Sequence, residues 1–171
     1  ANNDLNIGDQ LEVMTPTGNF KIETNPTIKK TYALFAAGSG ITPVISMAKS
    51  ILKDETESDV SIVYGNKGCN SIIFREELEA LKNQYMNRLR LVHILSRESL
   101  GNDIQKGRID EQKTLDIYDA FFKNAVIDGA YICGPESMIH GVKDGLSAKG
   151  VEMKNIHFEL FTSPSAKKES T

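Results

Sequence analysis

Residues 30–55 read KTYALFAAGSGITPVISMAKSILKDE, a run whose apolar pattern changes at a pair of glycines. The part that precedes Gly38 is continuously small and apolar, which predicts a buried strand. Beyond the glycines, apolar residues recur at helical spacing from Val44 to Leu52, which predicts a helix over 41–55. The stretch therefore predicts a strand that turns into a helix at a glycine-rich loop.

The rest of the chain continues this alternation. Further strands are expected at 59–66, 88–96, 129–134 and 155–161, and further helices at 74–85, 111–124 and 135–150. Alternating strands and helices are typical of parallel sheets with crossover helices. We therefore predict an α/β fold, a Rossmann-like five-stranded parallel sheet with helices on both faces. Ligands of such sheets bind at the carboxyl ends of the strands, where the winding reverses.

Composition narrows the classes of partner. The 171 residues are 40% hydrophobic and 25% charged, and the net charge of −3 disfavours nucleic acid or an anionic membrane as the main partner. No stretch approaches the roughly 20 apolar residues of a membrane span, and no signal peptide is visible. Cys69 and Cys133 form neither a disulfide framework nor a zinc motif, so we predict no metal site and a cytoplasmic location.

The turn formed by Gly38, Ser39 and Gly40 is the first candidate site. Glycine admits positive φ and close approach of a ligand, and the helix N-terminus beyond it offers free N–H groups. This pattern predicts a pyrophosphate site, to which Thr42 can donate its hydroxyl. Pro43 suits the first helical turn but removes the third glycine of G-x-G-x-x-G. A tight turn without a ligand is the alternative, whereas a Walker A loop is rejected because no G-K-[ST] follows.

The ends of the next two strands favour NADP(H) over NAD(H). Asn66 stands where a common NAD site has an acidic residue that binds the ribose hydroxyls. Ser96 and Arg97 end the following strand, and a hydroxyl beside a guanidinium suits a 2′-phosphate. Lys106 and Arg108 are further candidates in the next loop, although ordinary surface cations are the favoured interpretation for these two. A solvated loop is the alternative for Ser96 and Arg97.

The last two strands supply Cys133 and Glu159. Cys133, Gly134 and Pro135 precede a helix, where a thiol can be activated or a small side chain can touch a ligand ring. A cysteine hydrolase is disfavoured because none of the three histidines lies in a nucleophile motif. Glu159 is either a solvent-facing strand residue or a carboxylate beside a redox centre.

Taken in order, the motifs GSGITP, YGN, SRE, CGP-x-x-M and E-x-F resemble the nucleotide-binding domain of the ferredoxin–NADP(H) reductase superfamily. Within it, YGNKGCNSIIFREELEALKNQY and HILSRES are most similar to the reductase component of phenylacetyl-CoA epoxidase and its phenol-hydroxylase-type relatives. The resemblance covers nearly all of the chain. It implies that Cys133 and Glu159 lie near the hydride-transfer centre as catalytic residues. The cofactor-binding residues that it implies are Gly38, Ser39, Gly40, Thr42, Pro43, Asn66, Ser96, Arg97, Lys106, Arg108, Gly134, Pro135 and Met138.

The resemblance also implies hydride transfer from NADPH to FAD, followed by electron transfer to a [2Fe–2S] centre and an oxygenase. Residues 1–29 are expected to be the last hairpin of a flavin-binding barrel, with strands at 11–14 and 20–23. An NAD(P)H-binding domain over 30–162 and a linker over 163–171 follow.

Two departures from the family pattern qualify this expectation. The flavin motif R-x-[YF]-[ST] and the cluster motif C-x4-C-x2-C are both absent. FAD and [2Fe–2S] are therefore expected only in the full-length protein, and the chain alone is expected to be inactive. A non-catalytic nucleotide-binding or protein-interaction module is one alternative, and a reductase for a different acceptor is another.

Overall fold

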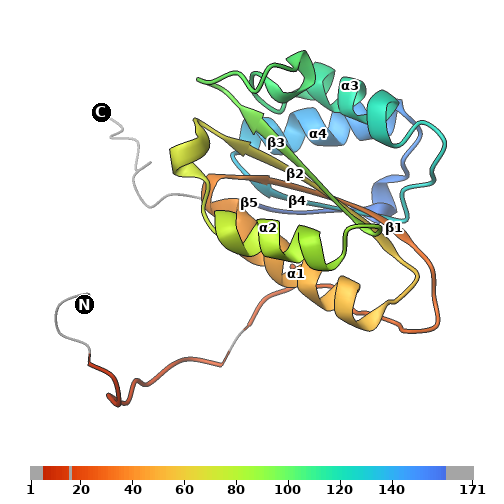
Figure 1. Ribbon diagram of the computed structural model, residues 1–171. Coiled ribbons are helices and arrows are strands. Elements are labelled where there is room, and N and C mark those ends of the chain that lie inside the picture. Colours follow the sequence, from red (N-terminus) through yellow and green to blue (C-terminus); the bar gives the residue numbers. More distant parts are fainter. Residues whose placement is uncertain (1–5, 16, 161–171) are drawn as a thin grey trace, which may run out of the picture.

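The computed structural model describes residues 6–15 and 17–160, which form a five-stranded parallel sheet between two pairs of helices. Helices α1 and α2 cover one face of the sheet, and α3 and α4 cover the other (Figure 1). The strands are β1 (Thr31–Ala37), β2 (Asp59–Asn66), β3 (Leu89–Leu95), β4 (Gly129–Gly134) and β5 (Ile156–Leu160). The helices are α1 (Ile41–Asp54), α2 (Arg75–Gln84), α3 (Glu111–Phe121) and α4 (Glu136–Ala148). Short 3-10 turns occupy Gly38–Gly40, Cys69–Ser71, Asp103–Gln105 and Met153–Asn155. The predicted fold is confirmed.

The strand order β3-β2-β1-β4-β5 places the reversal of winding between β1 and β4. The chain runs outward from β1 through β2 to β3 and then crosses back to the other side of β1. Ala36 of β1 is paired with Cys133 of β4, so the turns that leave these two strands lie side by side. A crevice at the carboxyl ends of the strands is expected at such a reversal.

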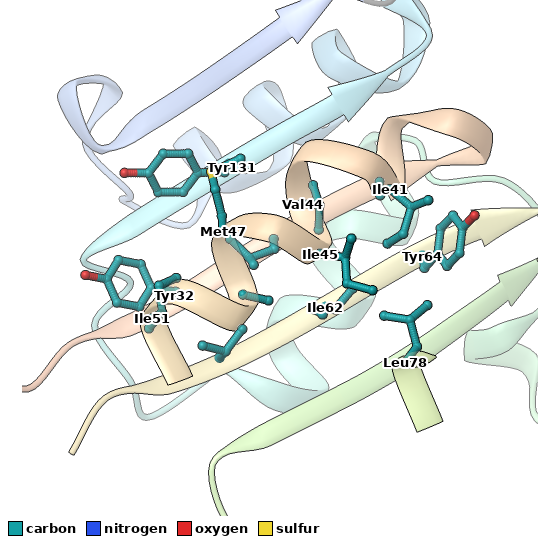
Figure 2. Packing of buried hydrophobic residues seen from close by; sticks show 14 of the residues in the cluster. Tyr32, Ile41, Val44, Ile45, Met47, Ile51, Ile62, Tyr64, Leu78 and Tyr131 are labelled. Atoms are coloured by element: carbon teal, nitrogen blue, oxygen red, sulfur yellow. The ribbon is translucent and has the colours of Figure 1, made fainter. Parts of the chain in front are cut away.

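The side chains between α1 and the sheet are almost completely buried. Figure 2 shows Val44, Ile45 and Met47 of α1 in one apolar cluster with Ile62 of β2 and Tyr131 of β4. Each is at most 8% exposed, and burying one such apolar side chain contributes about 1.5–3 kcal/mol. A second apolar cluster fills the space between the sheet and α3 and α4. The central strands are therefore buried on both faces, as a parallel sheet requires.

The prediction of two strands at 11–14 and 20–23 is wrong. No residue of 6–15 or 17–29 belongs to a strand, and Val13 and Met14 are largely exposed. A two-stranded hairpin is marginal in water unless further strands or a packing surface support it. The apolar residues of 11–14 have no such support within the part of the chain that the structure describes.

The second half of this segment still lies against the domain. Phe20 and Ile22 pack on the cluster beneath α1, and the Phe20 ring meets the Tyr131 ring edge-on with centroids 6.0 Å apart. Lys21 and Glu23, between and after them, are exposed. The segment thus alternates half-buried and exposed side chains with the two-residue period of a strand, although it has no strand partner.

A buried carboxylate fastens the segment before β1 to the domain. Glu55, which follows α1, is completely buried. It accepts hydrogen bonds from the backbone N–H of Asn25 at 3.0 Å, the Tyr32 hydroxyl at 3.1 Å and the Ser58 hydroxyl at 2.7 Å. Arg88 donates to the backbone carbonyls of Glu55 and Ser58. Burial and the neighbouring Glu55 charge raise the pKa of Tyr32, so its hydroxyl stays protonated and keeps donating.

None of the helices within 6–15 and 17–160 combines the length and the apolar character that crossing a membrane requires. The predicted linker 163–171 lies outside the described residues, as does the end of the predicted domain at 162.

Candidate functional site

A cleft of about 570 Å³ opens at the carboxyl edge of the sheet. It is lined by residues at or directly after the ends of β1, β2, β3 and β4, by the loop before α3 and by the first turn of α4. The predicted cofactor-binding residues that line it are Gly38, Ser39, Asn66, Ser96, Arg97, Arg108, Gly134, Pro135 and Met138. Residues that lie far apart in the sequence are therefore brought to one cavity, at the position where winding reverses.

The turn after β1 is held in place by hydrogen bonds to its carbonyl groups. Gly38 has a φ of +53°, in the left-handed region that glycine tolerates. The Tyr64 hydroxyl donates to the carbonyl of Gly38 at 2.9 Å, and the Thr42 hydroxyl donates to that of Ser39 at 3.0 Å. Thr42 does not line the cleft, and its hydroxyl is used within the turn. Pro43 lies in the first turn of α1, as its fixed φ predicts.

Gly40 allows the start of α1 to pack closely against β4. A Cβ atom at this position would lie 2.1 Å from the carbonyl oxygen of Cys133 and 2.7 Å from its carbonyl carbon. Gly40 is buried and does not line the cleft, so glycine is required here because α1 begins against the backbone of β4. This differs from the sequence interpretation, in which Gly40 gives a ligand access to the backbone. The structure gives Gly40 a contact with a strand that lies far along the chain.

The end of β4 is shaped by a second close contact. A Cβ atom at Gly134 would lie 2.6 Å from the terminal methyl group of Met138, and both residues line the cleft. Pro135 immediately precedes α4, whose first turn carries Ser137 into the cleft lining. Ser137 was not predicted, although it lies between two residues of the CGP-x-x-M motif.

Cations surround the part of the cleft at the ends of β2 and β3. Lys67, Arg97 and Arg108 line it and are exposed, and its lining contains no Asp or Glu among the described residues. The backbone N–H of Ser96 donates to the carbonyl of Asn66 at 3.0 Å, and that of Arg97 to the carbonyl of Lys67 at 2.9 Å. These bonds place the two strand ends side by side.

Two of the cations at this edge differ from the prediction. Lys67 was missed by the sequence analysis, although it directly follows the YGN motif at a strand end. Lys106, which was predicted, does not line the cleft. Its backbone forms a bridge to Leu95, and Gly107 donates to the carbonyl of Leu95 at 2.9 Å. That attachment brings Arg108, two residues further on, into the cleft lining.

Asn66 supplies a polar group that the described chain leaves without a partner. Its Nδ2 atom is buried and makes no hydrogen bond to residues 6–15 and 17–160. Buried polar groups are nearly always hydrogen-bonded in folded proteins. This atom is closed off from the cleft, although other atoms of Asn66 line it.

A carboxylate holds the loop next to this rim. Glu98 accepts a hydrogen bond from the backbone N–H of Cys69 at 3.0 Å. That bond and a second one from the Cys69 thiol lower the pKa of Glu98. The bond to Glu98 in turn raises the pKa of the Cys69 thiol. Glu98 therefore holds the loop after β2 in place, with its carboxylate accepting hydrogen bonds from that loop.

Cys133 and Glu159 are paired neighbours on β4 and β5. Cys133 is completely buried and does not line the cleft. Burial and the nearby Glu159 charge raise the pKa of the Cys133 thiol to about 11. Burial and the raised pKa both disfavour an activated thiolate at neutral pH, one of the two possibilities raised by the sequence. Glu159 is exposed on the edge strand, and Phe161 of the E-x-F motif lies outside the described residues.

In the described residues, no three His, Cys, Asp or Glu side chains are grouped so that they could hold a metal ion. The chemistry that the cleft can support is recognition of an anionic, hydrogen-bonding molecule through backbone, amide and cationic groups. A phosphorylated nucleotide has these properties.

Comparison with known proteins supports the same assignment. Residues 34–144 match the family model described as the oxidoreductase NAD-binding domain. The chain is 37% identical over 164 residues to a component of 1,2-phenylacetyl-CoA epoxidase from Escherichia coli K12, covering 96% of this chain and 46% of that protein. It is also 37% identical over 157 residues to the ferredoxin reductase component of 3-ketosteroid-9-alpha-monooxygenase from Rhodococcus rhodochrous, covering 91% of this chain and 40% of that protein.

Among solved structures, the cytochrome b5 reductase domain of Ulva prolifera nitrate reductase superposes with a TM-score of 0.74 and 25% identity. The match covers 92% of this chain and 61% of that one. The chain spans less than half the length of the phenylacetyl-CoA epoxidase component and of the 3-ketosteroid monooxygenase reductase component. The resemblance stated from the motifs is confirmed: the chain belongs to the oxidoreductase NAD-binding domain family, of the ferredoxin–NADP(H) reductase type.

Proposed function

We propose that the cleft binds NADPH, and that the chain is the nucleotide-binding part of a longer flavin-dependent reductase. The observation that carries the proposal is the composition of one cavity. It combines a glycine turn, the side chain of Asn66 and three cations without an acid among the described residues. A dinucleotide with a pyrophosphate and a 2′-phosphate presents the matching anionic and acceptor groups.

The parts of the cleft suggest how the coenzyme would be divided among them. The Gly38–Ser39 turn and the first turn of α4 would hold the pyrophosphate, since both present backbone N–H groups at a helix start. Ser96, Arg97 and Arg108 would hold the 2′-phosphate, because guanidinium groups bind phosphate through paired hydrogen bonds. Gly134 and Pro135 would contact the nicotinamide end.

The role of the protein in the reaction is to bind and orient. When bound by the longer protein, FAD supplies the acceptor for the hydride of the reduced nicotinamide. Cys133 acts neither as acid nor as base in this proposal, because its thiol is buried and neutral. It helps to position the end of β4 through its carbonyl, against which Gly40 packs. Glu159, paired with Cys133, is proposed to face the contact between nicotinamide and flavin.

The relatives suggest the wider reaction. Two of them are components of oxygenase systems, a phenylacetyl-CoA epoxidase and a 3-ketosteroid monooxygenase. We therefore propose that the longer protein also carries a [2Fe–2S] centre and reduces an oxygenase component in the cytoplasm. Phenylacetate degradation is the first candidate pathway.

The binding claim can be tested on the 171-residue chain by isothermal titration calorimetry with NADPH, NADH and ADP. Removing a charge-assisted contact costs about 1.5–3 kcal/mol, so Arg97→Ala is expected to weaken NADPH binding at least about tenfold. NADH binding should change less than about twofold. Lys123→Ala, an exposed cation outside the cleft lining, is the matched control and should leave both affinities unchanged. Equal losses for NADPH and NADH would contradict recognition of the 2′-phosphate by Arg97.

A further inference from the structure

The peptide group between Gly38 and Ser39 is contacted by a side chain from β2. The Tyr64 hydroxyl donates to the carbonyl of Gly38 at 2.9 Å. That carbonyl also accepts the backbone N–H of Ile41, which is shared with the carbonyl of Ser39. Tyr64 is completely buried and does not line the cleft, whereas Gly38 and Ser39 do. Any effect of Tyr64 on a bound molecule must therefore pass through the backbone of the turn.

We infer that Tyr64 is a positioning residue for the pyrophosphate: its hydroxyl holds the Gly38 carbonyl so that the N–H of Ser39 faces the bound molecule. This inference rests on the proposed function. A trans peptide is planar, with its C=O and N–H groups on opposite sides, and none of the described residues has a cis peptide. Drawing the Gly38 carbonyl toward Tyr64 therefore turns the Ser39 N–H away from Tyr64 and toward the cleft that both turn residues line.

The glycine at the start of the turn makes this hydroxyl important. Glycine adopts left-handed and right-handed backbone about equally well, so the φ of +53° at Gly38 is not imposed by the residue itself. A peptide turned the other way would present a carbonyl oxygen to the anion in place of a donor. Burial raises the pKa of the Tyr64 hydroxyl, which therefore stays protonated and keeps donating at neutral pH.

Two buried tyrosines of the same apolar cluster allow a matched comparison (Figure 2). Tyr64→Phe removes the hydroxyl but keeps the ring, which packs in the cluster and lies 5.9 Å from the His93 ring between centroids. Tyr32→Phe is the control, because the Tyr32 hydroxyl is also bonded, to Glu55 at 3.1 Å, but lies outside the cleft lining. Both variants lose one hydroxyl hydrogen bond, and only Tyr64→Phe alters the turn.

The inference is tested by calorimetric titration of both variants with NADPH, ADP and adenosine 2′-monophosphate. Tyr64→Phe is expected to weaken NADPH and ADP about fivefold, because the turn no longer aims its N–H at the pyrophosphate. Adenosine 2′-monophosphate has no pyrophosphate and should change less than about twofold. Tyr32→Phe should leave all three affinities unchanged. Urea unfolding of the two variants should show similar losses of stability, so that destabilisation alone does not account for the difference in binding.

A second measurement uses the unmodified chain and does not depend on how a variant folds. In nitrogen–proton correlation spectra recorded by NMR, ADP should shift the Ser39 amide resonance, and adenosine 2′-monophosphate should shift it much less. The reason is that the Ser39 N–H is the group that the Tyr64 hydroxyl is inferred to aim at the pyrophosphate.

The outcomes separate this inference from the function on which it rests. If the chain binds NADPH and ADP but Tyr64→Phe leaves both affinities unchanged, or the Ser39 amide does not respond to ADP, the role of Tyr64 is refuted while the nucleotide site stands. Equal weakening of ADP and adenosine 2′-monophosphate would also refute it, because the hydroxyl would then support the whole domain. If the unmodified chain binds none of the three nucleotides, the proposed function and the inference both fail.

Discussion

Replacing Gly40 by alanine should separate the packing role of this glycine from a role in binding. The added Cβ atom would lie 2.1 Å from the carbonyl oxygen of Cys133, a distance that requires the start of α1 or the end of β4 to move. Because the obstructing atoms are backbone, no side-chain rotation can relieve the contact. Overpacking typically costs about 1–3 kcal/mol, and we expect Gly40→Ala to lower the free energy of unfolding by about 3 kcal/mol.

Gly38→Ala is the matched control two residues earlier. A Cβ atom there meets nothing within 4 Å, but φ is +53°. An alanine in that conformation costs about 1 kcal/mol, and Gly38→Asn should cost less because asparagine tolerates left-handed backbone. The expected order of destabilisation is therefore Gly40→Ala, then Gly38→Ala, then Gly38→Asn.

Urea unfolding followed by circular dichroism measures these differences. For a domain of this size, about 3 kcal/mol corresponds to a loss of roughly 6–12 °C in the thermal midpoint, which leaves a folded protein at about 25 °C. If Gly40→Ala is no more destabilising than Gly38→Ala, the start of α1 does not lie as close to the Cys133 carbonyl in solution as this prediction requires.

Three further predictions concern groups outside the cleft lining. Glu55→Ala should lower the free energy of unfolding by about 3 kcal/mol, because it leaves the buried hydroxyls of Tyr32 and Ser58 without their acceptor. Glu57→Ala, at an exposed position, should cost under about 0.5 kcal/mol in the same urea titration. In native protein at a pH of about 8, iodoacetamide should label Cys69 and spare Cys133, because the Cys133 thiol is buried with a pKa of about 11. Mass spectrometry of digests measures the labelling, and modification of Cys133 in the native protein would contradict its burial. Glu98→Gln should accelerate labelling of Cys69, because the hydrogen bond to the Glu98 carboxylate raises the pKa of that thiol, and an unchanged rate would show that the bond is not made in solution.

The sheet and its helices could be predicted because their patterns are local. Continuous apolar runs bounded by glycine or charged residues specify buried strands such as β1 and β4, and a period near four specifies the buried face of α1. The glycine turn and the SRE motif could be placed at one edge because carboxyl ends of parallel strands share an edge.

The features that could not be predicted depend on contacts between distant segments. Glycine is required at position 40 because the Cys133 carbonyl group, far along the chain on β4, leaves no room for a Cβ atom. The burial of Cys133 depends on its packing in the cluster beneath α1. Lys67 lines the cleft and Lys106 does not, because the backbone of Lys106 is bridged to Leu95 at the end of β3. The strands expected at 11–14 and 20–23 are not formed because a two-stranded hairpin needs further strands or a packing surface, which the sequence of the segment does not supply.

The most direct test of the central claim is a crystal structure of the chain with NADP⁺. We predict electron density for the pyrophosphate between the Gly38–Ser39 turn and the first turn of α4, and for the 2′-phosphate within hydrogen-bonding distance of Arg97. Ordered coenzyme bound elsewhere on the protein, or a cleft that stays empty at saturating coenzyme with no lattice contact across it, would contradict the account.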